Sequence, residues 1–203
     1  MVHTSDPKAS LVALNMPSPR IAVIQPVVPD YRVPLFASLH ERFGDRFAVY
    51  AGLASGGGTI CMDSRAAGFV RTMENRHFLG ESFVWQSGHG RDLLAADVVV
   101  APGSLRFFSS QWLVWNRRRR GLPTVLWGHA HGNHAAAWLL RRAMFRAASG
   151  YIAYTRSDGD VIRRVRGDNN VWVASNSCVW KKECRPLFTA LQPINVVCIG
   201  RLI

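Results

Sequence analysis

Three histidines follow a short apolar run near the middle of the chain. The stretch PTVLWGHAHGNH, residues 123–134, places His129, His131 and His134 directly after an expected β-strand. The HxHxxH spacing could bind zinc, but no further His or carboxylate ligand with recognisable spacing accompanies it, so we predict no metal site. A neutral imidazole at His129, the residue nearest the strand end, could instead form a hydrogen bond with a hydroxyl group or a phosphate. His131 and His134 are each expected to be ordinary loop residues.

A second group of polar residues lies in the first loop, QPVVPDYR. Asp30, Tyr31 and Arg32 stand just before a helical pattern, where the N-terminal end of the helix could receive an anion or a sugar hydroxyl. The alternative is that Asp30 caps the helix and Arg32 is solvated. The loop lacks the GxGxxG pattern that lets a dinucleotide pyrophosphate approach the backbone. A nicotinamide-dependent oxidoreductase is therefore disfavoured.

Two segments are rich in arginine. NRRRRG, residues 116–121, follows an expected helix and is either a nucleic-acid patch or a basic helix end capped by Gly121. The helical pattern at 135–148 carries Arg142 and Arg146 one turn apart, among aromatic and aliphatic residues. It could lie on an anionic membrane or pack its apolar face on a sheet.

Composition narrows the class of protein. The 203 residues carry 25 Lys plus Arg against 13 Asp plus Glu, a net charge of +12 that implies an anionic partner. No run reaches the roughly 18 to 20 apolar residues of a membrane-spanning helix. The four cysteines lack CxxC spacing, which favours a reducing cytoplasm over a zinc or disulfide scaffold. A non-enzymatic basic module binding a membrane or nucleic acid stays an alternative, although no RNP, KH or zinc-finger pattern is present.

Short apolar runs alternate with helical patterns along most of the chain. The runs that predict β-strands are residues 20–26, 46–52, 97–103, 123–128, 150–155 and 170–175. This alternation is typical of an α/β protein with a parallel sheet and helices on both faces. Between 59 and 96 the segments FVRTM, RHFLG and FVWQSG could be strands or loops. In such a sheet, ligands bind outside the carboxyl ends of the strands, which is where the first loop and His129 are expected to lie.

The order and spacing of several segments resemble those of a known family. These segments are PDYRVPLFxxL after the first strand, WGH after a central strand, an Arg-rich helix leading to GYIAYT, Asn176 after a late strand, and VVCIGRLI near the end. Together they resemble the N-terminal half of a family 4 (group 1) glycosyltransferase of the GT-B fold, over residues 20–203. In that family two Rossmann-like domains face each other across a cleft. The first holds the acceptor and the second the nucleotide-sugar donor.

The resemblance implies a division of the chain and a reaction. The composition of residues 1–19, which mix Pro, Ser, Asp and Lys, predicts a disordered leader. The resemblance implies a Rossmann-like acceptor domain with a parallel β-sheet and helices on both faces (20–176), a linker (177–193) and the first strand of a donor domain (194–203). The implied reaction is transfer of a hexose from a nucleotide sugar to a lipid-linked or saccharide acceptor, with retention of configuration and without a metal or other cofactor. Cell-envelope or exopolysaccharide synthesis in the cytoplasm, peripheral to the inner leaflet, would fit the basic charge.

The resemblance also implies roles for individual residues. His129 would be the catalytic histidine. Asp30, Tyr31, Arg32 and His131 would contact the acceptor. Gly200 and Arg201 would bind the donor diphosphate, for which a guanidinium is well suited. The lysine and paired glutamates that the family uses next would lie beyond Ile203, so we expect residues 1–203 by themselves to be catalytically inactive.

Overall fold

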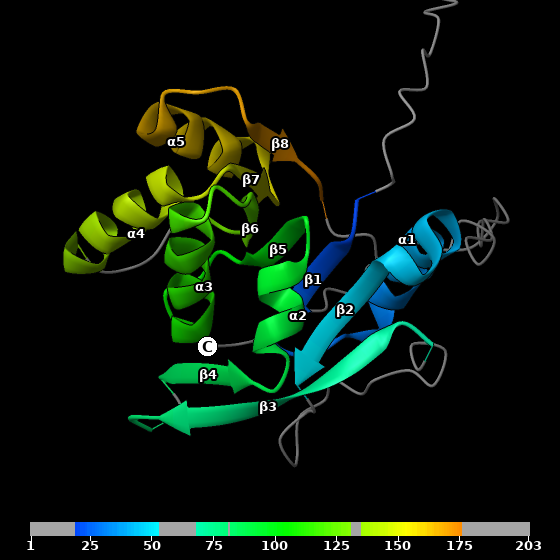
Figure 1. Ribbon diagram of the computed structural model, residues 1–203. Helices are drawn as coiled ribbons and strands as arrows, with labels where there is room; N and C mark the ends of the chain where they lie inside the picture. The colour runs from blue at the N-terminus through cyan, green and yellow to red at the C-terminus, as the bar shows by residue number, and fades with distance from the viewer. Residues whose placement is uncertain (1–18, 53–67, 81, 131–134, 176–203) are drawn as a thin grey trace, which may run out of the picture.

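An eight-stranded sheet runs through the described part of the protein (Figure 1). The computed structural model describes residues 19–52, 68–80, 82–130 and 135–175. The strands are β1 (Ile21–Gln25), β2 (Phe47–Gly52), β3 (Val70–Phe78), β4 (Phe83–Ser87), β5 (Val98–Pro102), β6 (Thr124–Gly128), β7 (Gly150–Ala153) and β8 (Val171–Val173). The α-helices are α1 (Val33–Phe43), α2 (Gly90–Ala95), α3 (Phe108–Arg119), α4 (Ala135–Ala147) and α5 (Arg156–Arg166). Short 3-10 helices span Asp30–Arg32 and Gly44–Arg46.

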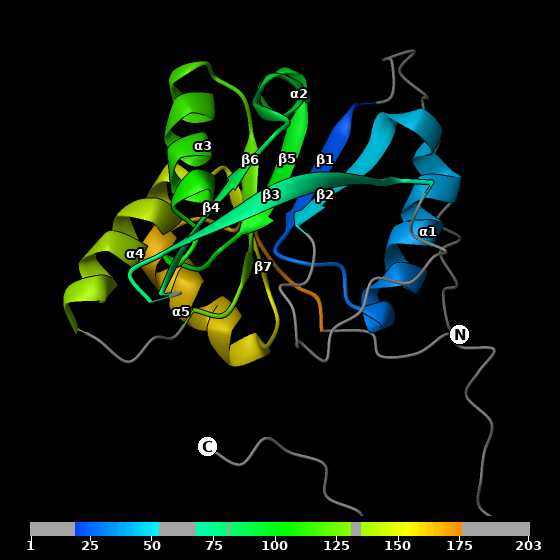
Figure 2. The ribbon, with the colours of Figure 1, turned by 90° about the horizontal axis from the view of Figure 1, so that it is seen from below.

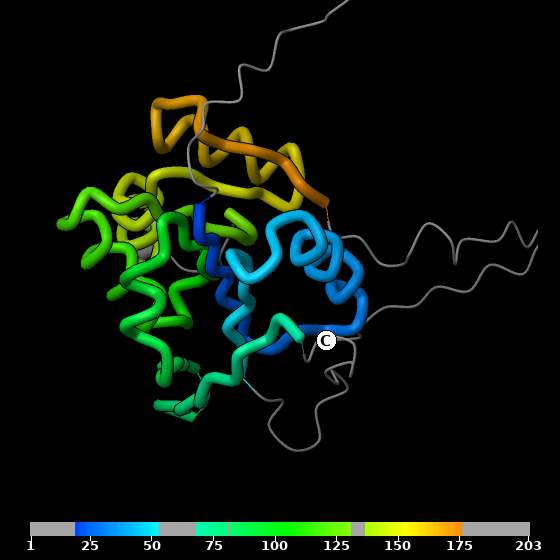
Figure 3. The backbone as a smooth tube through the Cα atoms, turned by 45° about the vertical axis from the view of Figure 1, so that its right-hand side comes forward, coloured from blue at the N-terminus to red at the C-terminus, as the bar shows by residue number. Residues whose placement is uncertain are grey.

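The strand order creates a crossover point at β1. The order is β4-β3-β2-β1-β5-β6-β7-β8, and neighbouring strands pair in parallel except β3 with β4. The chain first builds outward from β1 to β4 and then returns to place β5 on the other side of β1. Figure 3 shows β3, in teal, far from β8, in orange, because these strands lie toward opposite ends of the sheet. The loop after β1 leads to α1 on one face of the sheet, and the loop after β5 leads to α3 on the other face. Proteins of the α/β class commonly bind ligands between two such loops.

Helices cover both faces of the sheet, as the sequence predicted. On one face, α2 to α5 bury residues such as Leu113, Phe145 and Ile162 against the central strands. On the other, α1 buries Val33 and Phe36 in a second hydrophobic cluster. Figure 2 shows α1 on the opposite side of the sheet from α3 and α4. The α/β, Rossmann-like prediction is therefore confirmed.

The region that the sequence left open, residues 59–96, contains a β-hairpin in its described part. β3 and β4 pair antiparallel at the edge of the sheet, so the sheet is mixed rather than wholly parallel. Leu79 and Gly80 form the turn with positive φ values of 50° and 61°, a conformation that glycine adopts without steric cost. An antiparallel edge strand of this kind is common on otherwise parallel sheets. Periodicity did not reveal it because short apolar runs fit strands and loops equally well.

Local capping signals position the helices. Pro34 occupies the first turn of α1, and Gly44 ends the helix with φ 56°. Thr155 caps α5, because its hydroxyl oxygen accepts a hydrogen bond from the Asp158 N–H, and Gly167 closes the same helix in the left-handed conformation. The start of α5 is thereby fixed next to the end of β7, where Asp158 contributes to the site described below.

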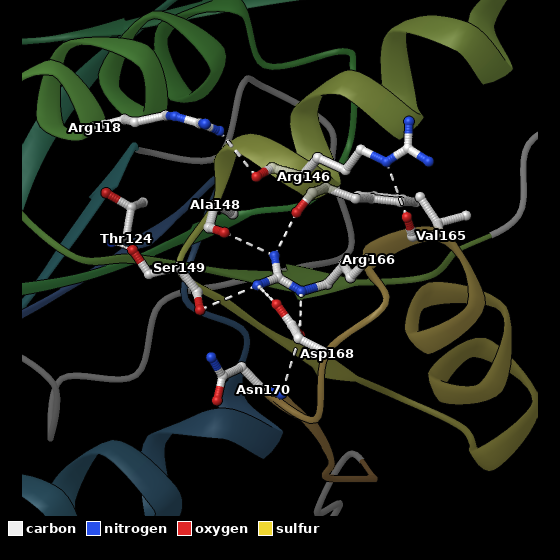
Figure 4. Close-up of polar contacts among 10 residues, drawn as sticks. Arg118, Thr124, Arg146, Ala148, Ser149, Val165, Arg166, Asp168 and Asn170 are labelled. Carbon is white, nitrogen blue, oxygen red and sulfur yellow. Dashed lines mark hydrogen bonds and ion pairs between the residues drawn. The ribbon is translucent and has the colours of Figure 1, made fainter.

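Several arginines serve the fold itself. Arg166, whose side chain is 4% exposed, donates hydrogen bonds to the carbonyl oxygens of Phe145, Ala148 and Ser149 at the end of α4 and pairs with Asp168 (Figure 4). These bonds satisfy carbonyl groups that a helix end leaves without intrahelical partners. Arg146 in turn donates to the Val165 carbonyl. Part of the positive charge is thus used inside the molecule.

Candidate functional site

A cleft of about 490 Å³ lies at the carboxyl ends of the central strands. Its walls come from the loop after β1, the loop after β5 and the end of β6, with Arg141 of α4 and Tyr154 after β7 completing them. This is the crossover point at which the strand order reverses. The fold therefore brings the first loop and His129 together, as the sequence predicted for residues that follow strands of one parallel sheet.

His129 is held at this cleft by a buried carboxylate. Its Nδ1 lies 3.1 Å from Oδ2 of Asp158, which is 3% exposed, whereas the His129 side chain is 65% exposed. Asp158 also accepts hydrogen bonds from the Ala130 N–H at 2.8 Å and the Thr155 hydroxyl at 2.7 Å. An ionised carboxylate accepts from Nδ1–H, which leaves Nε2 of a neutral imidazole able to accept a hydrogen bond from a hydroxyl group.

Sequence reasoning missed Asp158, although a signal for it exists. The segment Thr155-Arg-Ser-Asp158 follows a strand and has the spacing of a capping box, in which a Ser or Thr cap is paired with an acidic residue three positions later. That spacing predicts a helix start. It does not reveal that the same carboxylate reaches His129, 29 positions earlier in the chain.

The side chain of Tyr151 holds the backbone of His129 in place. The Tyr151 hydroxyl donates to the His129 carbonyl oxygen at 3.1 Å. Burial, reinforced by the Asp158 charge, raises the pKa of the Tyr151 phenol well above its usual value, so the group remains a donor. Gly103 makes room for it, since an ideal Cβ at that position would overlap the Tyr151 hydroxyl oxygen.

Arg32 also lines the cleft. Its guanidinium donates to Gln25 Oε1 and to the Tyr154 hydroxyl, and its Cζ lies 4.6 Å from the centroid of the Trp127 ring. Arg32 is 9% exposed, so the interpretation of this residue as solvated is wrong. It is buried because planar aromatic rings and two oxygen acceptors replace the water around its charge.

Of the two residues that precede Arg32, one lines the cleft and the other does not. Tyr31 lines it and is 38% exposed. Asp30 is exposed and does not belong to the lining residues. The capping interpretation of Asp30 is also wrong, because the N-cap positions of the 3-10 helix and of α1 are Pro29 and Arg32, and neither helix has a side-chain cap.

The arginine-rich segments contribute less to the cleft than their sequence suggests. Arg141 of α4 lines it and donates to the Ala130 carbonyl at 3.4 Å, whereas Arg142 and Arg146 do not line it. Arg117 is fully buried and bonded to backbone carbonyls. The first arginine of residues 116–121 is therefore structural, which favours the interpretation as a helix end over a nucleic-acid patch.

Other predicted residues fall outside the described part of the chain. These are His131, His134, Asn176, Gly200, Arg201 and all four cysteines. Among the residues that the structure does describe, no three His, Cys, Asp or Glu side chains gather as potential metal ligands. Within the same residues, each helix is too short or too polar to cross a membrane.

The cleft thus combines an imidazole oriented by a buried carboxylate with two arginines from different elements. Such a site can orient a hydroxyl group and attract an anionic group beside it. No protein-family model matches the chain, and a search of curated proteins finds no match to its sequence.

Proposed function

We propose that residues 20–176 form the acceptor-binding domain of a retaining glycosyltransferase that moves a hexose from a nucleotide sugar to a lipid-linked or saccharide acceptor. The observation that carries the proposal is the pair of His129 and Asp158 at the cleft. Its support is chemical, because the pair presents an oriented imidazole where an acceptor hydroxyl would lie. The donor and the stereochemistry follow from the family resemblance, as do the roles of Gly200 and Arg201.

The His129 imidazole would hold the reacting hydroxyl and respond to its change in charge. With Nδ1 bonded to Asp158, Nε2 accepts the hydroxyl hydrogen bond, and the buried carboxylate stabilises positive charge that develops on the ring. Asp158 is itself held by Ala130 and Thr155, so the imidazole is oriented before a ligand binds. Orientation of this kind lowers the entropic cost of bringing the reacting groups together.

The arginines at the cleft favour an acceptor that carries phosphate. Arg32 and Arg141 line the cleft from different elements, and Arg32 is almost completely buried. A cation removed from bulk water attracts an anion more strongly than a solvated cation does. A polyprenyl phosphate, with a hydroxyl-bearing or phosphorylated head, therefore suits the cleft better than a neutral sugar does.

The surface of α4 fits a peripheral location at the inner leaflet of the plasma membrane. Its inward face packs Met144 and Phe145 in the core, whereas Leu139 and Leu140 are 67% and 64% exposed. Exposed leucines beside basic residues are typical of helices that lie in the interface of an anionic bilayer. Co-sedimentation with phosphatidylglycerol vesicles at low salt is expected and should fall in the Leu139→Ser, Leu140→Ser variant.

The site proposal is tested by NMR titration with farnesyl phosphate, a short polyprenyl phosphate. Long-range ¹H–¹⁵N spectra should show the Nδ1–H tautomer of His129, and its signals should shift on titration. At about pH 6, where a phosphate monoester still carries a P–OH group that can donate to Nε2, His129→Ala should weaken binding by about twofold to twelvefold, the contribution of one hydrogen bond of about 0.5–1.5 kcal/mol. His77→Ala removes an exposed histidine on β3 outside the cleft and is the matched control.

The alternative function makes a different prediction. If both histidine variants bind farnesyl phosphate equally, the pair of His129 and Asp158 does not form the acceptor site. A salt-dependent shift of DNA or RNA without any response of His129 would then support a basic binding module. The readout of this test is binding, so it does not depend on hexose transfer.

A further inference from the structure

A second cavity lies beside the cleft, on the other side of the carboxyl end of β1. It has a volume of about 180 Å³ and is lined mainly by residues of β4, α2 and α3 and the residues next to them. The side chains that form most of its wall are apolar: Ile24, Met73, Trp85, Leu93, Trp112 and Leu113. For comparison, an apolar protein cavity of about 150 Å³ accommodates a benzene molecule. The cavity is therefore large enough for a segment of hydrocarbon.

Most polar groups at this cavity have protein partners, although the buried Oε1 of Gln86 has none. Gln86 donates both amide hydrogens, to the Gln25 carbonyl at 2.9 Å and to Asn75 Oδ1 at 3.0 Å. The Ser109 hydroxyl oxygen accepts from the Gln86 backbone N–H at 3.1 Å. A sugar or phosphate placed among the apolar side chains would lose its hydrogen bonds to water and gain few from the protein. The chemistry of the wall selects an apolar ligand.

The cavity and the cleft meet β1 at consecutive residues. Ile24 lines the cavity and the next residue, Gln25, lines the cleft, with their side chains on opposite faces of the strand. Gln25 links the two sites, since its carbonyl accepts from Gln86 at the cavity and its side chain accepts from Arg32 at the cleft. A cationic cleft beside an apolar cavity complements an amphiphile with an anionic head and a hydrocarbon tail.

An apolar surface continues outward from the cavity. Trp85 and Trp112 lie at the cavity with their ring centroids 6.3 Å apart. Phe108 and Trp112 are 43% and 45% exposed one turn apart on α3, and Phe108 stacks on Phe83 of β4 at 4.7 Å. The apolar path is thus longer than the cavity itself, which favours a chain over a single small ring.

We propose that this cavity binds the hydrocarbon chain of a lipid-linked acceptor, with Trp112 as the side chain that covers it. The assignment rests on the proposed function for its acceptor class. The chain-binding property stands on the cavity, its apolar wall and the exposed aromatic surface of α3. A cavity with this property would select lipid-linked acceptors over free saccharides.

The test compares octyl β-glucoside with methyl β-glucoside by isothermal titration calorimetry, both below micelle-forming concentrations. The two probes share a neutral head group, so a difference between them reports the chain. Octyl glucoside should bind with a negative heat-capacity change, the mark of apolar burial, and methyl glucoside should not bind. Equal binding of the two probes would overturn the proposal.

Two tryptophans of α3 give a matched pair of variants. Trp112 lines the cavity and is 45% exposed, whereas Trp115 does not line it and is 43% exposed. Trp112→Ala should weaken octyl glucoside binding by about fivefold or more, as expected for loss of an aromatic wall. Trp115→Ala should change it by less than about twofold. Equal losses in the two variants would contradict a chain site at this cavity.

A filling variant keeps the proposal testable if Trp112→Ala disturbs folding. Gly90 lines the cavity, and an added Cβ there would meet no atom within 4 Å. Gly90→Leu should fold and should reduce octyl glucoside binding, because its side chain occupies space at the cavity. Unchanged binding in a folded Gly90→Leu protein would count against the site. Neither variant touches His129, so failure here is distinct from failure of the farnesyl phosphate test.

Discussion

Replacing Arg117 by leucine tests whether the arginine-rich end of α3 stabilises the fold. Arg117 is 0% exposed. Its guanidinium donates to the carbonyl oxygens of Leu93 at 2.7 Å, Ala96 at 2.9 Å and Pro123 at 2.9 Å, and to the Thr124 hydroxyl at 3.1 Å. Burial lowers the pKa of Arg117, but an arginine remains charged in proteins. Leucine would leave these acceptors without their donor.

The expected loss follows from these bonds. Hydrogen bonds to a charged group contribute about 1.5–3 kcal/mol each, but water can reach some carbonyls after the replacement. Each buried acceptor that is left without a donor costs about 1–3 kcal/mol. We therefore expect Arg117→Leu to lower the free energy of unfolding by about 3–5 kcal/mol. Arg117→Lys keeps the charge but not the planar set of guanidinium N–H donors. It should lower the free energy of unfolding by about 2 kcal/mol.

Urea unfolding followed by circular dichroism measures this loss. Arg119→Leu is the matched control, since Arg119 lies two positions later on α3 and is exposed. It should shift the free energy of unfolding by no more than about 0.5 kcal/mol. Equal unfolding midpoints for the leucine variants at 117 and 119 would refute the structural role. If the Arg117→Leu protein does not fold, the lysine variant supplies the graded comparison.

Three further predictions concern the support of the cleft. Asp158→Ala should lower the free energy of unfolding by about 2–4 kcal/mol, because charge-assisted hydrogen bonds are lost. It should also remove the preference of His129 for the Nδ1–H tautomer in ¹H–¹⁵N spectra. An unchanged tautomer would contradict the orienting role of Asp158. Gly103→Ala should cost about 1–3 kcal/mol because its Cβ displaces the Tyr151 hydroxyl, while Gly68→Ala, with open space around its Cβ, should cost less; equal losses would contradict this. Because burial raises the pKa of Tyr151, its stabilising contribution is complete below about pH 10, where unfolded tyrosine ionises, and falls as pH rises from there towards the folded-state pKa. Urea midpoints at pH 9 and 11 should therefore differ less in Tyr151→Phe than in the unchanged protein, and an unaltered difference would refute the assignment.

The sequence by itself determined the class of the fold and the edge at which the site lies. Alternating apolar runs and helical patterns predict a parallel sheet with helices on both faces, because period and length are local properties of the chain. Residues that follow parallel strands must meet at one edge. The first loop and His129 could therefore be assigned to one site before any coordinates.

Only the tertiary structure decided which side chains meet at that edge. Asp158 looks like an ordinary helix-start residue until the parallel pairing of β6 and β7 brings the start of α5 to His129. Arg32 and Arg117 look solvated in the sequence, but ring stacking and backbone carbonyls bury them. The net charge of a sequence reflects how many arginines it contains but not which hydrogen-bond acceptors surround each of them. Those acceptors come from distant segments, so packing alone decides whether an arginine faces a ligand or stabilises the fold.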